Sequence, residues 1–224
     1  QPEFVGVISV VRRAAAFTAQ DAGQLEFLAG QAAISFENAA LHQTVQEQAL
    51  TDELTGLSNV REMQRALDRE LERGHRFDTP VSFVILDLDD FKLINDTFGH
   101  QQGDQVLIEV SRVLRRVSRD IDEPARYGGE ELAVVLAQTD MEGALGAAER
   151  MRAGIEALRI VRVDGSPEPI TVTASFGVAS VMAGAEDKRS LIAAADAALY
   201  RAKRNGKNRV ERARPAAPTL SADR

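Results

Sequence analysis

The sequence predicts an α+β fold, in which helices flank a central, mostly antiparallel sheet and a long connecting helix precedes it. Strand and helix patterns alternate irregularly along the chain, with one hairpin pattern in the middle. The 224 residues are 44% hydrophobic, which is enough apolar surface for a sizeable core. A continuous helical pattern near the N-terminal end accounts for the connecting helix.

The N-terminal region predicts one strand and one long helix. Apolar residues alternate in the range 1–16, which is typical of a strand: Val5, Val7, Ile8, Val10 and Val11. From Thr18 to Thr51 apolar residues recur at helical spacing, and Thr18 with Asp21 three residues later fits an N-cap. One strand is too little chain to bury the apolar face of this helix, so we expect it to pair with a second copy. The alternative is a single amphipathic helix within its own domain.

The remaining elements follow from periodicity and from the residues that begin and end helices and strands. The predicted helices span residues 61–73, 90–98, 102–118, 140–158 and 187–205. The predicted strands are VSFVILDLD (81–89), a hairpin around RYGGEELAVVLAQ (126–138), strands near 160–163 and 169–180, and a short strand at 208–212. Residues 213–224 are predicted to be a disordered tail.

Composition excludes several classes of function. The net charge of −7 argues against a broad basic surface for nucleic acid, so a bound phosphate would need local lysines, local arginines or a metal ion. The absence of cysteine excludes disulfides, thiolate nucleophiles and cysteine-based zinc sites. No apolar run approaches the ~20 residues of a transmembrane helix, and no signal peptide begins the chain. We therefore expect no membrane segment and a cytoplasmic location. Gln1 in place of Met indicates a fragment of a longer protein.

Two acidic groups are predicted to meet at one edge of the sheet. Asp87 ends a buried apolar strand, and the glycines Gly128 and Gly129 are followed directly by Glu130 and Glu131. An acidic strand end beside an acidic hairpin turn is an arrangement that binds Mg²⁺ through oxygen ligands. Two adjacent glycines also let a nucleotide approach the backbone without a Cβ in the way. The alternative is an aspartate that caps a helix and a plain Gly-Gly hairpin turn.

These residues belong to four segments that resemble the GGDEF family, the diguanylate cyclases. The segments are TDELTGLSN (51–59), DLDDFKLINDTFGHQQGD (87–104), RYGGEEL (126–132) and ADAALYRAKRNGKNRV (195–210). The resemblance implies the palm-like fold of nucleotidyl cyclases for residues 52–212. Residues 1–42, with GVISVVRR and FLAGQAAISFENAAL, resemble the last strand and helix of a GAF domain. Residues 43–51 would then form a helical linker, expected to be a coiled coil.

The resemblance implies a metal-dependent reaction. Two GTP molecules would condense into cyclic di-GMP with release of two pyrophosphates, in a homodimer that brings two substrates together. The implied catalytic residues are Asp87, Glu130 and Glu131. The implied ligands of Mg²⁺ (or Mn²⁺) are Asp87, the carbonyl of Leu88 and Glu130, with Glu131 as a second-metal or supporting ligand. No residue is an obvious dedicated base, so activation of the attacking hydroxyl by the metal is the economical account.

The resemblance also implies the residues that bind GTP. Asn95 and Asp104 would face guanine, whose N1–H and N2–H₂ donors one carboxylate can accept as a pair. Lys92, Lys203 and Lys207 would meet the phosphates. The alternatives remain open: Asp104 would also fit the N-cap of helix 102–118, and lysines at a helix end ordinarily compensate the helix dipole.

An Arg-x-x-Asp pair precedes the glycine turn at the spacing of the family's inhibitory site. Arg119 and Asp122 would bind the product, and Arg150 lies where the family has a further arginine of that site. The simpler alternative is a solvated ion pair.

Two other functions stay open at this stage. A domain of this fold without turnover could serve as a receptor for cyclic di-GMP or GTP, and the chain could act as a dimerising signal relay through its helix. Two positions depart from the family pattern: Leu132 replaces the usual phenylalanine and is expected to be buried, and Val60 replaces the usual arginine.

Overall fold

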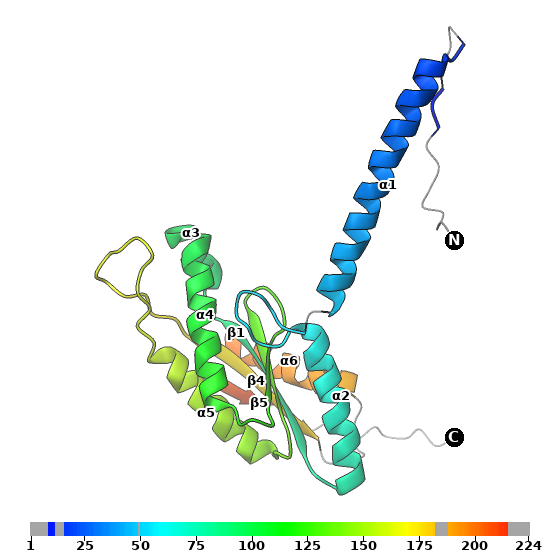
Figure 1. Cartoon of the computed structure of the whole chain (residues 1–224). Helices are drawn as coiled ribbons and strands as arrows, with labels where there is room; N and C mark the ends of the chain where they lie inside the picture. The colour runs from blue at the N-terminus through cyan, green and yellow to red at the C-terminus, as the bar shows by residue number, and fades with distance from the viewer. Residues whose placement is uncertain (1–8, 12–15, 49, 182–187, 215–224) are drawn as a thin grey trace, which may run out of the picture. The chain divides into compact units, whose positions relative to one another are not determined.

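The computed structural model describes residues 9–11, 16–48, 50–181 and 188–214 (Figure 1). The chain divides into two compact units, residues 1–49 and residues 50–224.

The first unit is built on α1 (Ala19–Gln48). Thr18 Oγ1 accepts a hydrogen bond from the Asp21 N–H at 3.2 Å, and Asp21 Oδ2 accepts one from the Thr18 N–H at 2.8 Å. This reciprocal pair is a capping box, which confirms the predicted start of the helix. The helix ends at Gln48 rather than at Thr51, since Thr51 instead pairs with Ser58 in an isolated bridge.

The strand predicted within residues 1–16 is only partly testable. Residues 1–8 and 12–15 lie outside the described part of the chain, and residues 9–11 form no strand.

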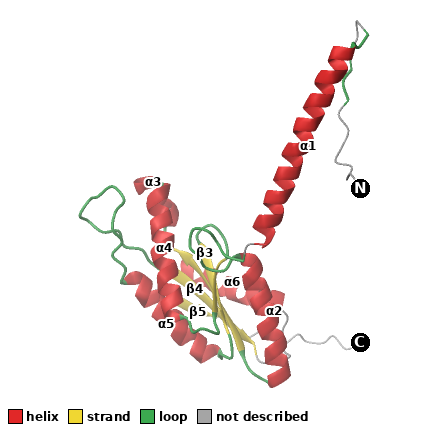
Figure 2. Ribbon diagram, in the orientation of Figure 1, coloured by secondary structure: helices red, strands yellow, loops and turns green. Residues whose placement is uncertain are grey.

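The second unit contains one five-stranded sheet in the order β2-β3-β1-β4-β5. Figure 2 shows its strands in yellow among the helices of this unit. Its strands are β1 (Val81–Leu88), β2 (Glu123–Arg126), β3 (Glu131–Leu136), β4 (Ala174–Val181) and β5 (Val210–Arg212). β4 and β5 run parallel, and the other neighbours run antiparallel. The prediction of a mostly antiparallel sheet within an α+β fold is confirmed.

Helices cover both faces of this sheet because successive side chains of β1 point to opposite faces. Val84, Leu86 and Leu88 join the core formed with α4 (His100–Val117) and α5 (Met141–Glu156). Phe83 and Ile85 join the core formed with α2 (Val60–Phe77) and α6 (Lys188–Arg204). All eight residues of β1 are buried, as expected for a central strand covered on both sides. The remaining helix, α3 (Phe91–Phe98), packs against α4.

Two predictions about elements are wrong. No strand forms at 160–163, where a single bridge joins Ile160 to Ile170. The N–H of Val163 bonds to the side chain of Gln102 instead of to a neighbouring strand. The later strand begins at Ala174, not at residue 169.

Helix α4 begins at His100, with Gly99 as its N-cap residue. Asp104 therefore lies inside the helix, and its alternative interpretation as the N-cap is wrong. Leu132 is fully buried, as predicted. Of the predicted tail, residues 215–224 lie outside the described part of the chain.

Candidate active site

The acidic strand end and the hairpin turn lie side by side. Asp87, near the end of β1, is 6% exposed and lies opposite Glu131 in the register between β1 and β3. The N–H of Leu88 donates a hydrogen bond to the carbonyl of Glu130 at 3.4 Å. Glu130 and Glu131 are both half-buried. The structure thus brings together the residues that the sequence places at this edge.

Burial and crowding of negative charge shift the pKa values at this edge. Burial raises the pKa of Asp87, and the ammonium of Lys203, whose Nζ lies 2.7 Å from Asp87 Oδ2, opposes that rise. Burial and the charge of Asp87 raise the pKa of Glu130. In both cases the ionised form is poorly solvated and lies near another negative charge, which is Asp89 for Asp87 and Asp87 for Glu130. A bound cation would offset this unfavourable clustering of negative charge, and the ammonium of Lys203 already offsets part of it.

The donors at this edge suit a hard cation, since carboxylate and carbonyl oxygens are the ligands of Mg²⁺ and Mn²⁺. Among the described residues, no group of three or more acidic or histidine side chains is placed to hold a metal ion. An ion at Asp87 and Glu130 would therefore need main-chain or substrate oxygens as further ligands, which is usual for Mg²⁺ at phosphate sites.

The two glycines of the turn have different surroundings. A Cβ on Gly128 would lie 2.9 Å from Glu131 Oε2, whereas a Cβ on Gly129 would meet nothing within 4 Å. Neither glycine adopts a positive φ. A Cβ on Gly128 would therefore displace the end of the Glu131 side chain. Gly129 leaves open space in front of the turn, as expected if a ligand approaches the backbone there.

Arg126 fastens this turn, a role that the sequence did not reveal. Its Nε donates to the carbonyl of Gly128 at 3.2 Å, and its NH2 donates to the carbonyl of Gly129 at 2.8 Å. The same guanidinium forms an ion pair with Asp52. The planar fork of arginine holds its N–H donors in a fixed geometry, so it can bond to two carbonyls and a carboxylate more rigidly than the single ammonium of a lysine.

The residues expected to face guanine lie on two adjoining helices. Asn95 is half-buried on α3, and Asp104 is exposed near the start of α4. A Cβ on Gly103 would lie only 2.0 Å from Asn95 Oδ1, so α3 and α4 approach closely through this glycine. The structure thus brings Asn95 against the residue that precedes Asp104. Lys92 is exposed on α3.

The two C-terminal lysines reach acidic partners near the end of β1. Gly206, with a φ of 110°, follows the end of α6, and the N–H of Lys207 donates back to the carbonyl of Ala202. Lys203 pairs with Asp87, and Lys207 Nζ lies 2.6 Å from Asp90 Oδ1. Both ammonium groups therefore lie beside the acidic edge where phosphates would need cations.

Asp89 holds this region together, and sequence reasoning missed it. Its carboxylate accepts hydrogen bonds from Thr173 Oγ1 and Ser175 Oγ, each at 2.7 Å, and from the Asn208 N–H at 3.0 Å. It thereby joins the end of β1 to the start of β4 and to the turn after α6. Its partners are 84 to 119 residues away in sequence, so no local pattern could identify them.

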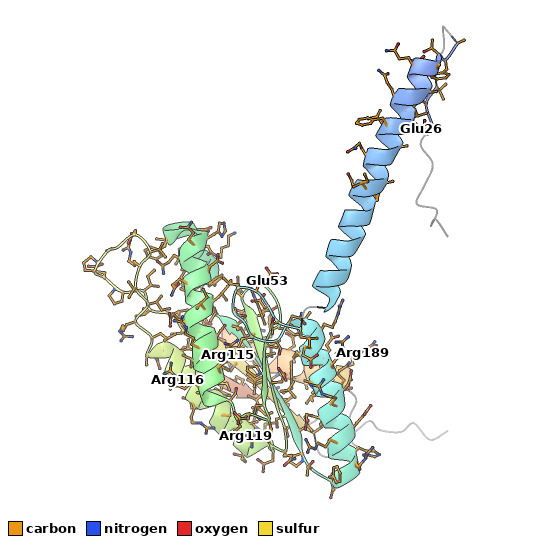
Figure 3. All side chains as sticks on the ribbon, viewed as in Figure 1. Glu26, Glu53, Arg115, Arg116, Arg119 and Arg189 are labelled. Atoms are coloured by element: carbon orange, nitrogen blue, oxygen red, sulfur yellow. The ribbon has the colours of Figure 1, made fainter. Side chains whose placement is uncertain are left out.

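Arg119 and Asp122 form an ion pair at the far end of α4 from α3 (Figure 3). Arg119 NH2 lies 2.7 Å from Asp122 Oδ1, and the same atom donates to the carbonyl of Ala137 and to Thr139 Oγ1. The side chain of Asp122 is 3% exposed, whereas that of Arg119 is 52% exposed. The ion pair of the simpler alternative is present, but it is solvated on one side only: the Asp122 carboxylate is buried, whereas about half of the Arg119 side chain is exposed.

Arg150 lies exposed on α5, with its NH1 close to Gly146. In the part of the chain that the structure describes, no hydrogen bond or ion pair joins Arg150 to Arg119 or Asp122. No helix in the described ranges is long and apolar enough to span a membrane.

Comparison with known proteins gives a consistent family. The model of the family described as "Diguanylate cyclase, GGDEF domain" matches residues 49–209. The chain is 42% identical over 171 residues to the response regulator PleD of Caulobacter vibrioides, covering 73% of this chain and 36% of PleD. It is 38% identical over 198 residues to diguanylate cyclase A of Treponema denticola, covering 87% of this chain and 51% of that protein.

A solved structure agrees with these relatives. The coiled coil and GGDEF domain of DgcB from Caulobacter crescentus, in complex with c-di-GMP, superposes with a TM-score of 0.71 and 34% identity. The match covers 84% of this chain and 99% of that one. The present chain spans between about a third and a half of the length of the two curated relatives.

Proposed function

This chain belongs to the GGDEF family of diguanylate cyclases, and from that premise we propose that it condenses two GTP molecules into cyclic di-GMP and two pyrophosphates. The observation that carries the proposal is the meeting of Asp87, Glu130 and Lys203 at one edge of the sheet. Two carboxylates and an ammonium there match the needs of a reaction in which a 3′-hydroxyl attacks an α-phosphorus and pyrophosphate leaves.

Asp87, Glu130 and the carbonyl of Leu88 would hold the metal ion, with Glu131 in a supporting position. When bound, Mg²⁺ or Mn²⁺ supplies neutralisation of the triphosphate charge and lowers the pKa of the attacking 3′-hydroxyl. Glu131 also supports the turn directly, because its carboxylate occupies the space beside Gly128.

The chain's own cations and amides would fix the substrate. Lys203 and Lys207 lie where they can exchange Asp87 and Asp90 for phosphate oxygens, and Lys92 would approach from α3. Asn95 and Asp104 would accept the N1–H and N2–H₂ donors of guanine. Adenine lacks that array, so it would leave the Asp104 carboxylate underpaired at a cost of about 1–3 kcal/mol.

We further propose that the active form is a homodimer. Each site would hold one GTP, so the reaction requires two sites that face each other. Helix α1 exposes large apolar side chains, such as Phe27 at 67% and Phe36 at 65%, which a second copy of the helix would cover. The coiled coil present in the DgcB structure supports this arrangement by analogy.

Product inhibition at Arg119, Asp122 and Arg150 is a further part of the proposal. The N–H groups on NH1 of Arg119, an atom that takes no part in the bonds to Asp122, Ala137 and Thr139, can donate to O6 or N7 of a guanine. Asp122 already accepts from Arg119 with both carboxylate oxygens and is only 3% exposed, so it would have to become more accessible before it could accept from the same base. Inhibition by this route would hold two domains apart, without competition against GTP.

The receptor alternative is less favoured, because a receptor without turnover has no need for the paired carboxylates and Lys203. A cytoplasmic location and the assignment of residues 1–42 to the end of a GAF domain remain proposals.

The decisive experiment is incubation with GTP and Mg²⁺, followed by separate measurement of pyrophosphate and cyclic di-GMP. We expect two pyrophosphates for each cyclic di-GMP, and neither product from Asp87→Asn. Binding of GTP or cyclic di-GMP without pyrophosphate release would favour a receptor and overturn the proposal.

A further inference from the structure

Helix α3 has limited support from the rest of the domain, although it carries Lys92 and Asn95. Phe91 and Ile94 anchor it in the core, whereas Leu93 is 65% exposed and Phe98 is 38% exposed. In Figure 1 the helix lies at the end of the α4 axis, with a long loop next to it. A shallow hollow of about 400 Å³ separates α3 from this loop, lined by Leu93, Thr97, Phe98, Arg162, Pro169 and Ile170.

That loop, residues 157–173, contributes Ile160, Ile170 and Val172 to the core shared with α4, and among the described residues its hydrogen bonds to α4 involve one side chain, that of Gln102. The N–H of Val163 donates to Gln102 Oε1 at 2.8 Å, and Gln102 Nε2 donates to the carbonyl of Val161 at 3.4 Å. The two ends of the Gln102 amide therefore hold the backbone on both sides of Arg162. The Ile160–Ile170 bridge closes the loop behind them.

Arg162 carries this restraint to α3. Its guanidinium lies over the ring of Phe98, 4.8 Å from the centroid, and also pairs with Asp164. A cation over an aromatic ring is attractive and fixes the position of both groups. Gln102 on α4 thus holds a loop whose arginine rests on the last residue of α3.

Gln102 is only 2% exposed, so its amide is a buried polar group. Burial of an amide costs free energy unless both of its ends are bonded, and an apolar residue would pack there without that cost. The simpler explanation of this residue is that the Gln102 amide, with both ends bonded, only stabilises the fold. Its position indicates a further role at the guanine site, because the next residue is Gly103, which Asn95 contacts, and Asp104 follows.

We propose that Gln102 is a positioning residue for guanine recognition. By fastening residues 161–163 to the start of α4, it holds Phe98 and α3 at the separation at which Asn95 and Asp104 meet one base. The inference rests on the proposed function, since it assigns Gln102 a part in selecting the GTP of that reaction.

The test compares Gln102→Leu with the parent protein and with Gln101→Leu, a matched control at an exposed glutamine in the same turn. We expect the KM for GTP to rise about tenfold in Gln102→Leu, the range that one or two net hydrogen bonds supply, with kcat changed less than about twofold. The preference for GTP over ITP should fall as well, because ITP lacks the N2 amine and a displaced Asn95–Asp104 pair loses that discrimination. Gln101→Leu should match the parent in both.

Gln102→Glu adds a second measurement, the pH dependence of the KM for GTP, which should not change if Gln102 only stabilises the fold. When protonated, the new carboxyl can donate to the Val161 carbonyl as the amide does, and when ionised it repels that oxygen. The KM ratio of this variant to the parent should therefore rise with pH, while the ratio for Gln102→Leu stays constant. Arg162→Met should raise the KM in the same way, and the double variant with Gln102→Leu should show less than the product of the two effects.

The outcomes are distinguishable. An active parent with an unchanged KM and GTP/ITP preference in folded Gln102→Leu would overturn this inference alone. If Gln102→Leu did not fold, a pH-independent KM ratio in Gln102→Glu together with a normal KM in Arg162→Met would do the same. A parent that neither binds nor turns over GTP would overturn the proposed function, and this inference with it.

Discussion

Asp52 and Arg126, 74 residues apart in the sequence, form an ion pair with 3.1 Å between Asp52 Oδ2 and Arg126 NH1. Asp52 lies at the beginning of the second unit, and Arg126 also bonds to the carbonyls of Gly128 and Gly129. Both side chains are about one-fifth exposed. The start of this unit is therefore coupled directly to the turn that presents Glu130.

Loss of this coupling should impair the turn. We expect Arg126→Met to lower kcat by about tenfold or more and the free energy of unfolding by about 1–3 kcal/mol, because it leaves Asp52 and two carbonyls underpaired. Steady-state kinetics and urea unfolding measure the two effects. The exposed Arg116 provides the control, since Arg116→Met should change neither quantity. If Arg126→Met had the kinetics of the parent protein, the turn would keep its conformation without Arg126, and this prediction would be wrong.

The same ion pair predicts a pH dependence of stability. Burial alone would raise the pKa of Asp52, but the hydrogen bonds from Thr55 and the charge of Arg126 outweigh it and lower the pKa below the ordinary 3.8. A carboxyl with a lowered folded pKa contributes stability above its unfolded pKa and loses it as the pH falls through the folded pKa. The loss of unfolding free energy in Asp52→Asn should thus be full at pH 7 and should shrink below about pH 4. A difference that is constant from pH 7 to pH 3 would contradict the pairing.

Glu130→Gln tests the proposed metal site, because it removes the carboxylate charge and leaves the side-chain volume almost unchanged. We expect turnover to fall at least about a hundredfold, since a ligand charge is lost, while the fold and most GTP affinity persist. Pyrophosphate release, circular dichroism and GTP titration separate these effects. Near-normal cyclic di-GMP production would refute the role of Glu130.

Product inhibition should depend on Arg119. Progress curves are expected to flatten early in the parent and to stay linear in Arg119→Ala. Thr139→Val is the matched control, because it removes one hydrogen bond from Arg119 but keeps the guanidinium. If added cyclic di-GMP inhibited Arg119→Ala as strongly as the parent, the Arg119–Asp122 pair would be structural only.

Deletion of residues 1–49 should separate folding from assembly. The remaining unit keeps its own sheet and core, so we expect it to fold, to be mostly monomeric and to work slowly. Its rate should rise more steeply than linearly with enzyme concentration, because two copies must meet for each turnover. Light scattering gives the mass, and a fully active monomer would exclude the proposed dimer.

Local patterns predicted most of the fold and the outline of the site. The apolar run VSFVILDL predicts a buried strand from local residues alone. The Gly-Gly pair followed by two glutamates likewise predicts a turn that presents carboxylates. The segment at 160–163 misled this reasoning because Val161 and Val163 alternate like a strand. Their backbone instead meets Gln102, about 60 residues earlier. Asp89 and Arg126 were missed for the same reason, since a side chain's distant partner leaves no trace in the residues around it.

The hydrogen bonds of Asp89 can be completed only late in synthesis, so the site is assembled late as well. A ribosome delivers the chain from its N-terminal end, so the acidic edge emerges long before Lys203 and Lys207. The Asn208 N–H that closes on Asp89 comes 119 residues after it. If the proposed function holds, a nascent chain that has formed β1 and its hairpin would lack its phosphate-binding lysines and would be inactive until its final helix and turn have docked.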